Sequence, residues 1–245
     1  MSMRSSHRGA ALPYQLLAGI VPCPRGWLAA TAKLQGITMS PEEPQVFDGF
    51  LNVLDYKPAY QIIAVHAPIG LLDEPGSKGR SCDQQARRLL GWPRAAAIAS
   101  APVRPSLRCR SYEEAVAANG GRLSPIVWYQ RRKIAEVDKD IAPYWQRTVF
   151  EVHPELSFFQ LNGDKPLQYP KRTGKGRDER REILEARIPG VERILEARLN
   201  RISAARLLDA AACLWTARRI MSRAVTRLPD DPEWDSQGLR MEMVR

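Results

Sequence analysis

The stretch YQLLAGIVPCPRGWLAATAKL, residues 14–34, decides the fold. Residues 14–21 form a compact apolar run that predicts a strand buried on both faces. Residues 22–26 carry two prolines and a glycine and predict a turn, after which residues 27–34 resume as a second strand. Residues 37–39 add a short third strand, so the chain is predicted to open with an antiparallel meander.

Helices and strands alternate after this meander. Residues 40–43, Ser-Pro-Glu-Glu, predict a helix start, and apolar residues recur behind it at helical spacing as far as Leu54. The apolar run at 61–67 predicts a strand, and a strand that returns after a helix implies parallel pairing. A helix capped by Ser81 or Asp83 follows through Leu90, and residues 95–101 predict a short strand.

The second half of the chain is predicted to be mostly helical. Helices are expected at 112–118 and 126–137, a strand at 148–152, helices over most of 177–225, and a short edge strand at 238–244. The fold class expected from this order is α/β with a helical C-terminal third. Because no internal repeat or linker is visible, we expect a flexible leader at 1–13 and a single domain at 14–245.

Composition limits the classes of partner. The net charge of +10 favours an anionic partner such as nucleic acid, although a basic surface without any partner is the alternative. No apolar run approaches the roughly 20 residues that a membrane span needs. The four cysteines form no C-x-x-C pair, which argues against a zinc ribbon and suits a reducing, cytoplasmic location.

Two places gather candidate carboxylates. Glu151 and His153 lie on one face of a strand end, and Glu155 starts the next helix, where a simple helix cap is the alternative to a site. Asp209 lies in an alanine-rich helix near the core, where a carboxylate needs a metal ion or, as the alternative, an ion pair with Arg206 or Arg218.

Basic side chains gather in a third place, the loop and helix start at 165–181. Glycines there let backbone amides approach phosphates, although the spacing does not match a Walker A loop. A merely solvated loop is the alternative. The residues expected to bind nucleic acid are Lys171, Arg172, Lys175, Arg177, Arg180 and Arg181, together with Arg87 and Arg88 on the helix that ends at Leu90.

The order of these motifs resembles a bacterial family known as domain of unknown function 429, described as predicted nucleases of RNase H-like fold. The resemblance covers nearly the whole chain after the leader, and it rests on many short motifs in the right order. The matching segments are Gly19 with Gly26-Trp27, Pro68 to Leu71, Cys82 to Arg87, Ala101 to Arg104, Lys133 to Asp138, Glu151 to Phe158, Leu207 to Ala210 and Gly238 to Glu242.

The resemblance implies a mixed five-stranded sheet flanked by helices. It also implies that carboxylates from two strands and a late helix hold divalent metal, with Mg²⁺ or Mn²⁺ suited to an all-oxygen site. Phosphodiester hydrolysis on that plan uses two ions about 4 Å apart. Glu151, Glu155 and Asp209 are then the expected catalytic residues, with Glu151 and Asp209 as metal ligands.

The sequence departs from the family pattern at two expected carboxylates. The pattern Gly-hydrophobic-Asp-Gly is replaced by Gly-Ile-Val-Pro at 19–22, and Asp-x-Pro-Ile-Gly is replaced by His-Ala-Pro-Ile-Gly at 66–70. Val21 cannot bind metal, whereas His66 is a candidate catalytic residue, as a ligand of Mn²⁺ or Zn²⁺ or as a general base.

Three hypotheses follow from this sequence. The chain is a nuclease with an altered, weakened metal site, or it is an inactive nucleic-acid-binding module, or its old cleft has become a protein-docking surface. Metal-dependent cleavage separates the first hypothesis from the others, and salt-sensitive binding to nucleic acid separates the second from the third.

Overall fold

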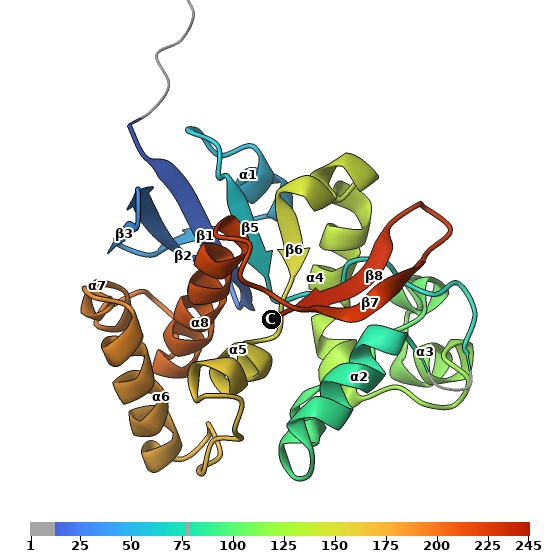
Figure 1. Cartoon of the computed structure of the whole chain (residues 1–245). Helices are drawn as coiled ribbons and strands as arrows, with labels where there is room; N and C mark the ends of the chain where they lie inside the picture. The colour runs from blue at the N-terminus through green and yellow to red at the C-terminus, as the bar shows by residue number, and fades with distance from the viewer. Residues whose placement is uncertain (1–12, 77–78) are drawn as a thin grey trace, which may run out of the picture.

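The computed structural model describes residues 13–76 and 79–245, so the predicted leader lies outside the described residues except for Pro13. The fold is α/β, with a mixed six-stranded sheet between helices, as Figure 1 shows. The sheet has the order β3-β2-β1-β5-β6, and β4 also pairs with β2. The strands are β1 (Gln15–Cys23), β2 (Gly26–Gln35), β3 (Thr38–Pro41), β4 (Gln45–Phe47), β5 (Ile62–Val65) and β6 (Val149–Glu151).

The predicted meander and the predicted parallel strand are confirmed. β1 pairs antiparallel with β2 as far as Cys23 and Gly26, so the turn is confined to Pro24 and Arg25. β5 runs parallel to β1, and β6 runs parallel to β5. The carboxyl ends of β1, β5 and β6 therefore meet at one edge of the sheet.

The predicted helix start at residues 40–43 is wrong. Pro44 would fall inside such a helix, where its missing N–H and its ring break the hydrogen-bond ladder. Residues 45–47 instead pair with Trp27 to Ala29 as β4. β3 and β4 thus both pair with β2, and the sheet has six strands rather than the expected five.

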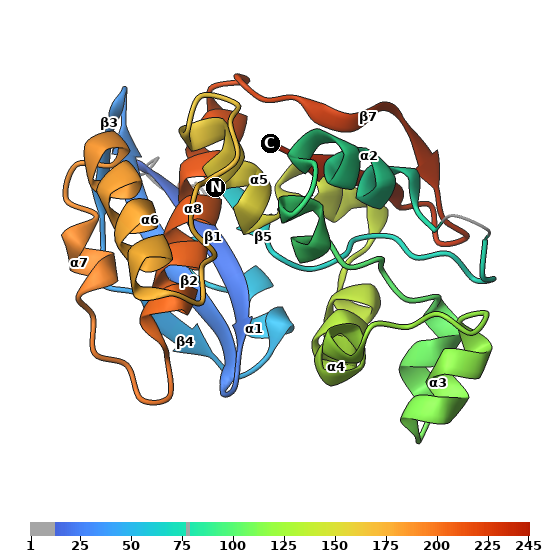
Figure 2. The same cartoon turned by 90° about the horizontal axis from the view of Figure 1, so that it is seen from below.

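Helices cover both faces of the sheet. On one face, Leu28 of the sheet belongs to the same buried cluster as Leu214 of α8. On the other face, Ile20 packs with Phe50 of α1 and Val137 of α4. Figure 2 shows α6, α7 and α8 together on one side of the strands. The helices are α1 (Phe50–Leu54), α2 (Ser81–Leu90), α3 (Tyr112–Ala118), α4 (Pro125–Asp140), α5 (Pro154–Leu161), α6 (Gly174–Arg187), α7 (Glu192–Leu195) and α8 (Ala204–Met221).

Helix α8 lies directly against β1 at Gly19. A Cβ atom at this position would overlap the backbone of Leu214 and of Ala210. The absence of a side chain therefore lets the helix approach the sheet closely, and this approach places Asp209 next to the carboxyl ends of the strands.

Two further expectations need correction. Residues 95–101 are not a strand, because the alanine-rich segment Arg94–Ala97 forms a 3₁₀ turn. The cap position of α2 is Arg80, and Asp83 bonds to the Arg80 side chain instead of capping the helix.

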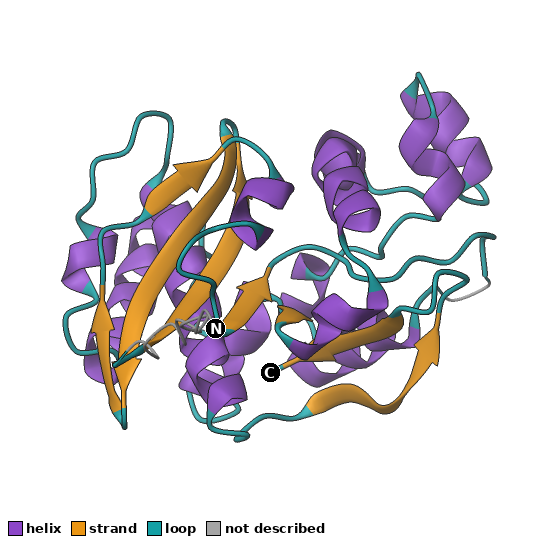
Figure 3. Cartoon of the chain, turned by 90° about the horizontal axis from the view of Figure 1, so that it is seen from above, coloured by secondary structure: helices purple, strands orange, loops and turns teal. Residues whose placement is uncertain are grey.

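The expected short edge strand at 238–244 is confirmed, and it lies in a two-stranded ribbon apart from the main sheet. β8 (Arg240–Val244) pairs with β7 (Arg227–Trp234) in a separate antiparallel ribbon. One parallel bridge, between Val152 and Val244, joins this ribbon to the end of the main sheet. Figure 3 shows the two groups of strands as distinct units.

Among the described residues, no helix combines the length and the apolar character needed to cross a bilayer.

Candidate functional site

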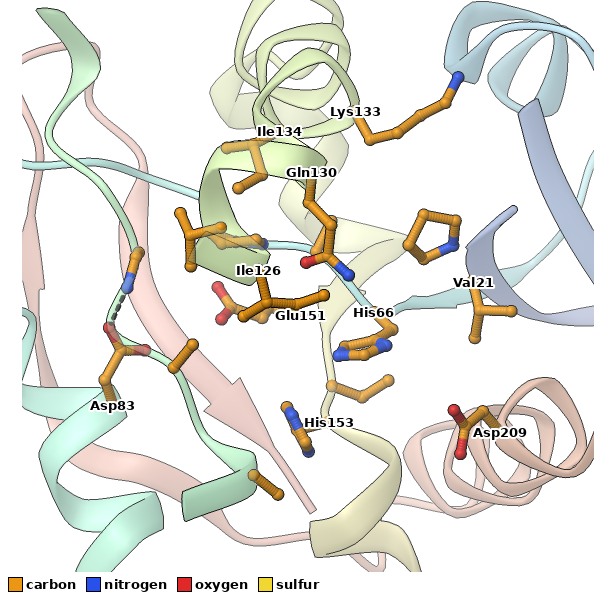
Figure 4. Close-up of a pocket in the computed structure, with 18 of the residues that line it drawn as sticks. Val21, His66, Asp83, Ile126, Gln130, Lys133, Ile134, Glu151, His153 and Asp209 are labelled. Atoms are coloured by element: carbon orange, nitrogen blue, oxygen red, sulfur yellow. Dashed lines mark hydrogen bonds between the residues drawn. The ribbon is translucent and has the colours of Figure 1, made fainter. Parts of the chain in front are cut away.

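A cavity of about 500 Å³ opens where the parallel strands end. Val21 of β1, His66 after β5 and Glu151 of β6 line it, and Asp209 reaches it from α8. Figure 4 shows these side chains around one space, although each comes from a different element. The fold thus brings together the two expected metal ligands and the two positions at which the expected carboxylates are replaced.

Two histidines face one another in this cavity. The rings of His66 and His153 are edge-to-face, with centroids 4.6 Å apart. Burial, and then the positive charges of Lys171 and Arg206, lower the pKa of His66 to about 3. Burial and the neighbouring His66 also hold the pKa of His153 well below its usual range. Both imidazoles are therefore neutral at physiological pH.

His153 and His66 differ in their hydrogen bonds. The Nδ1 atom of His153 accepts the backbone N–H of Glu155 at 3.2 Å, which caps helix α5. His153 is therefore tied to the start of this helix. The imidazole of His66 faces the cavity, and neither of its nitrogens has a hydrogen bond within the described residues. It can offer one donor and one acceptor to a ligand.

Glu151 is held by a buried arginine. Arg80 Nη2 lies 2.7 Å from Glu151 Oε1, and Arg80 Nη1 lies 2.9 Å from Oε2. The backbone N–H of Ile69 also donates to Glu151 at 2.7 Å. Burial raises the pKa of Glu151, and the Arg80 guanidinium opposes that rise. The expected metal ligand therefore has its charge balanced from inside the protein.

The same arginine also holds Asp83. Arg80 Nη2 lies 2.7 Å from Asp83 Oδ1, and further N–H groups of Arg80 donate to the carbonyl oxygens of Ile69 and Gly70. Arg80 is only 2% exposed. All its donor nitrogens are used, which suits a guanidinium that is fixed rather than mobile.

One group of side chains among the described residues could hold a metal ion. Ligand atoms of Cys82, Asp83 and Glu151 lie within 4.8 Å of one another, and all three residues are buried. Burial raises the pKa of the Cys82 thiol well above its usual range, however, so the thiol is protonated. Arg80 already donates to both carboxylates of this group. A cation here would have to displace a buried guanidinium or lie beside it.

Asp209 is paired with a basic side chain from the loop before α6. Lys171 Nζ lies 2.9 Å from Asp209 Oδ2, whereas the buried Asp209 Oδ1 has no hydrogen-bond partner in the part of the chain that the structure describes. Lys171 was expected to bind nucleic acid, and the structure places it at the cavity, next to Asp209. The expected alternative partner Arg206 also lines the cavity, but it donates to the carbonyl oxygen of Pro22.

Glu155 and Arg180 lie away from this cavity. They form a buried pair, with Arg180 Nη2 lying 2.8 Å and 3.0 Å from the two Glu155 oxygens. Arg180 is 1% exposed, so it cannot reach a nucleic acid as it was expected to do. Glu155 is 6% exposed and already paired, which does not fit its expected catalytic role. A carboxylate and an arginine that lie 25 residues apart gave no local sequence signal of this pair.

The other expected basic residues occupy the surface to different degrees. Arg172, Lys175 and Arg88 are exposed. The remaining three are partly buried: Arg87 donates to the carbonyl oxygen of Ile98, Arg177 to the carbonyl oxygen of Arg172, and Arg181 pairs with Glu185 at 3.2 Å.

Arg80 and Gln130 are cavity residues that were not foreseen from the sequence. Arg80 ends a loop rich in glycine and proline, where no periodicity marks a buried position. Gln130 lies on α4 between Ile126 and Ile134, and its amide points into the cavity in Figure 4. Its spacing of four residues from each isoleucine places all three on one face of the helix. This shared helix face was the one sequence pattern that could have pointed to Gln130 as a cavity residue.

Comparisons with known proteins give a family but no function. A sequence model of the family described as protein of unknown function, DUF429, matches residues 19–234. No curated protein and no solved structure matches the chain. The match confirms the family that the motifs suggested.

Proposed function

The chain belongs to the DUF429 family, and from its site we propose that it is an RNase H-like protein that binds nucleic acid without metal-dependent hydrolysis. The observation that carries this proposal is that the carboxylates at the cavity already have basic side chains of the protein as partners. Arg80 pairs with both Glu151 and Asp83, and Lys171 pairs with Asp209.

The RNase H-like part of the proposal rests on where the site residues lie in the fold, and not on which amino acids occupy those positions. The resemblance implies a mixed sheet and a metal site built by two strands and a late helix. Val21, His66, Glu151 and Asp209 come from three strand ends and α8, and they line one cavity. This convergence is what an RNase H-like arrangement requires.

The residues present do not fit a catalytic magnesium or manganese site. These ions prefer several anionic oxygens that are free to bind them. Val21 offers no ligand, His66 is a neutral imidazole, and the carboxylates of Glu151 and Asp209 already have cationic partners. An ion that displaced Arg80 would leave a guanidinium in a buried place without its partners, which is strongly unfavourable.

A metal-dependent hydrolase is therefore the second candidate. The group of Cys82, Asp83 and Glu151 is the observation in its favour. Metal-dependent hydrolysis at this group would require Arg80 to move away from the two carboxylates and Mg²⁺ or Mn²⁺ to bind in its place.

Nucleic acid as the partner is supported by charge. The net charge is +10, and the exposed side chains of Arg172 and Lys175 follow directly on Lys171, which lines the cavity. A strand whose end enters the cavity would have its next phosphates beside these side chains. Attraction of this kind is independent of sequence and sensitive to salt.

The experiment is a binding titration with labelled single-stranded and duplex DNA and RNA, followed by fluorescence anisotropy at several salt concentrations. We expect binding that weakens as salt rises, and we expect the slope of this dependence to fall by about 1 for each of Arg172→Gln and Lys175→Gln. Lys57→Gln is the matched control, because Lys57 is exposed but precedes β5 at the opposite edge of the sheet. Absence of salt-sensitive binding would leave a protein-docking surface as the remaining hypothesis.

The same strands are also incubated with Mg²⁺, Mn²⁺ or Zn²⁺ and examined for products. We expect none from the wild type. A double variant, Val21→Asp with His66→Asp, restores the two carboxylates of the family pattern and tests whether only these ligands are missing. Cleavage by the wild type that disappears in Asp209→Ala would contradict the proposal and favour the second candidate.

A further inference from the structure

The two ends of the cavity differ in chemistry. In Figure 4, Asp209 lies on one side of the cavity and Ile126 and Ile134 of α4 lie on the other side, with His66 between them. Lys171 pairs with Asp209, and Arg206 also lines the cavity. Ligand cavities of this size commonly combine apolar walls with a few polar groups that fix orientation. The occupant should therefore have an anionic group and a flat or apolar part.

The cationic end suits a phosphate. Among the described residues, Arg206 donates only to the carbonyl oxygen of Pro22, so its guanidinium keeps further N–H donors. Lys171 shares its charge with Asp209, but its side chain is 43% exposed and its ammonium has donors left for a second acceptor. Together with burial, the positive charges of both residues lower the pKa of His66, so both cations lie close to this imidazole.

The apolar end suits a nucleobase. Ile126, Gln130 and Ile134 form one stripe on α4, and Val127 lies next to it. Ala96, Ala97 and Ala99 line the same cavity. Because alanine side chains are short, this wall leaves room that larger side chains would fill.

Gln130 adds polar recognition between the two ends. Its amide has no hydrogen bond within the described residues, and in Figure 4 it points towards His66. A glutamine amide combines a donor and an acceptor on one edge, which is the pattern that reads the edge of a base.

We propose that the cavity is a nucleotide site, with the phosphate at Lys171, Arg206 and His66 and the base between the α4 stripe and the alanine wall. This inference rests on the proposed function, because the nucleotide bound here would be the terminal residue of a nucleic-acid strand. It goes further in assigning a site for a single nucleotide, so the protein should also bind free nucleoside monophosphates.

The test is isothermal titration calorimetry of the full chain with the four ribonucleoside 5′-monophosphates, in EDTA. Adenosine and inorganic phosphate are titrated separately, as the two halves of one ligand. We expect monophosphates to bind at least about tenfold more tightly than either half, because each half uses only one end of the cavity.

Three variants make the assignment specific. Gln130→Leu removes an amide that has no hydrogen bond among the described residues, so it should fold normally, weaken monophosphate binding by about tenfold and reduce the differences among the four bases. Arg206→Met should weaken binding of the monophosphates but leave adenosine unaffected. Lys175→Met is the control, since Lys175 is exposed outside the cavity and should affect only longer strands.

The outcomes separate this inference from the proposed function. If oligonucleotides bind but monophosphates do not, or if Gln130→Leu binds them as the wild type does, the nucleotide site is wrong and the proposed function stands. If neither kind of ligand binds, both are wrong.

Discussion

Arg80 is the buried cation on which the cavity depends, and its removal gives the sharpest prediction. Arg80→Met keeps an unbranched apolar side chain but leaves Glu151 and Asp83 as two buried carboxylates without a cation. Both of their side chains are at most 3% exposed, so water cannot replace the guanidinium. We expect a loss of about 3–5 kcal/mol of unfolding free energy, which corresponds to a fall in Tm on the order of 10 °C.

The pH dependence of this loss carries a definite sign. Burial raises the pKa of Glu151, and without Arg80 only the hydrogen bond from the Ile69 N–H opposes that rise. A carboxyl group whose pKa is higher in the folded than in the unfolded state destabilises the fold as pH rises through that range. The difference in stability between wild type and Arg80→Met should therefore shrink between pH 7 and pH 5, as Glu151 becomes protonated.

Urea unfolding followed by tryptophan fluorescence measures both effects. Arg193→Met is the matched control, because its ion pair with Glu43 is 3.3 Å long and its side chain is 59% exposed. Such surface pairs contribute about 0–1 kcal/mol. If Arg80→Met does not fold, Arg80→Lys is measured instead. This variant keeps the positive charge but loses the several N–H donors of the guanidinium, so its loss of unfolding free energy should be smaller and measurable. Equal stability of Arg80→Met and the control, or a deficit that is constant with pH, would refute this account of the site.

Three other predictions follow from packing and burial. The pKa of His66 is about 3 in the folded protein, so as pH falls below 6.5 this residue is protonated in the unfolded chain first. Between pH 7 and pH 5 the wild type should therefore lose up to about 2 kcal/mol of unfolding free energy from this residue. His66→Gln should lack this part of the acid sensitivity in urea unfolding, and an unchanged pH profile would show that His66 is not desolvated. Arg180→Met should cost about 3–5 kcal/mol and leave the affinity for nucleic acid per folded molecule unchanged, because Arg180 is buried against Glu155. A specific loss of affinity at unchanged stability would return Arg180 to the binding surface. Gly19→Ala should destabilise by about 1–3 kcal/mol, because its Cβ overlaps the backbone of α8, and a neutral effect would mean that this helix can shift.

Local patterns were sufficient for the parts of the fold that follow from a single segment. The apolar run 14–21 and the turn after it predicted the β1–β2 hairpin. The valine and phenylalanine residues at 148–152 predicted the strand β6, and Pro154 predicted the start of the helix after it. β4 and β7 were missed, because residues 45–47 and 227–234 have no alternating pattern of their own and become strands through their partners.

The candidate site was also predicted only in part. Its positions, Val21, His66, Glu151 and Asp209, were identified from motif order, and the fold brings them together. The cations that hold the acids were not identified. Arg80 comes from a loop without periodicity, and its pairing with Glu151 spans 71 residues of sequence. Charge compensation in the interior depends on tertiary distances, which no local pattern contains.

The central claim is that this protein binds nucleic acid with its own cations in place of a metal ion. The most direct measurement is the Kd of one labelled single strand at constant ionic strength, first in EDTA and then in Mg²⁺. The account predicts the same Kd in both solutions, apart from weak competition of Mg²⁺ for phosphates, and an intact strand at the end of each titration. Binding that requires Mg²⁺, or shortened products that appear with it, would contradict the claim.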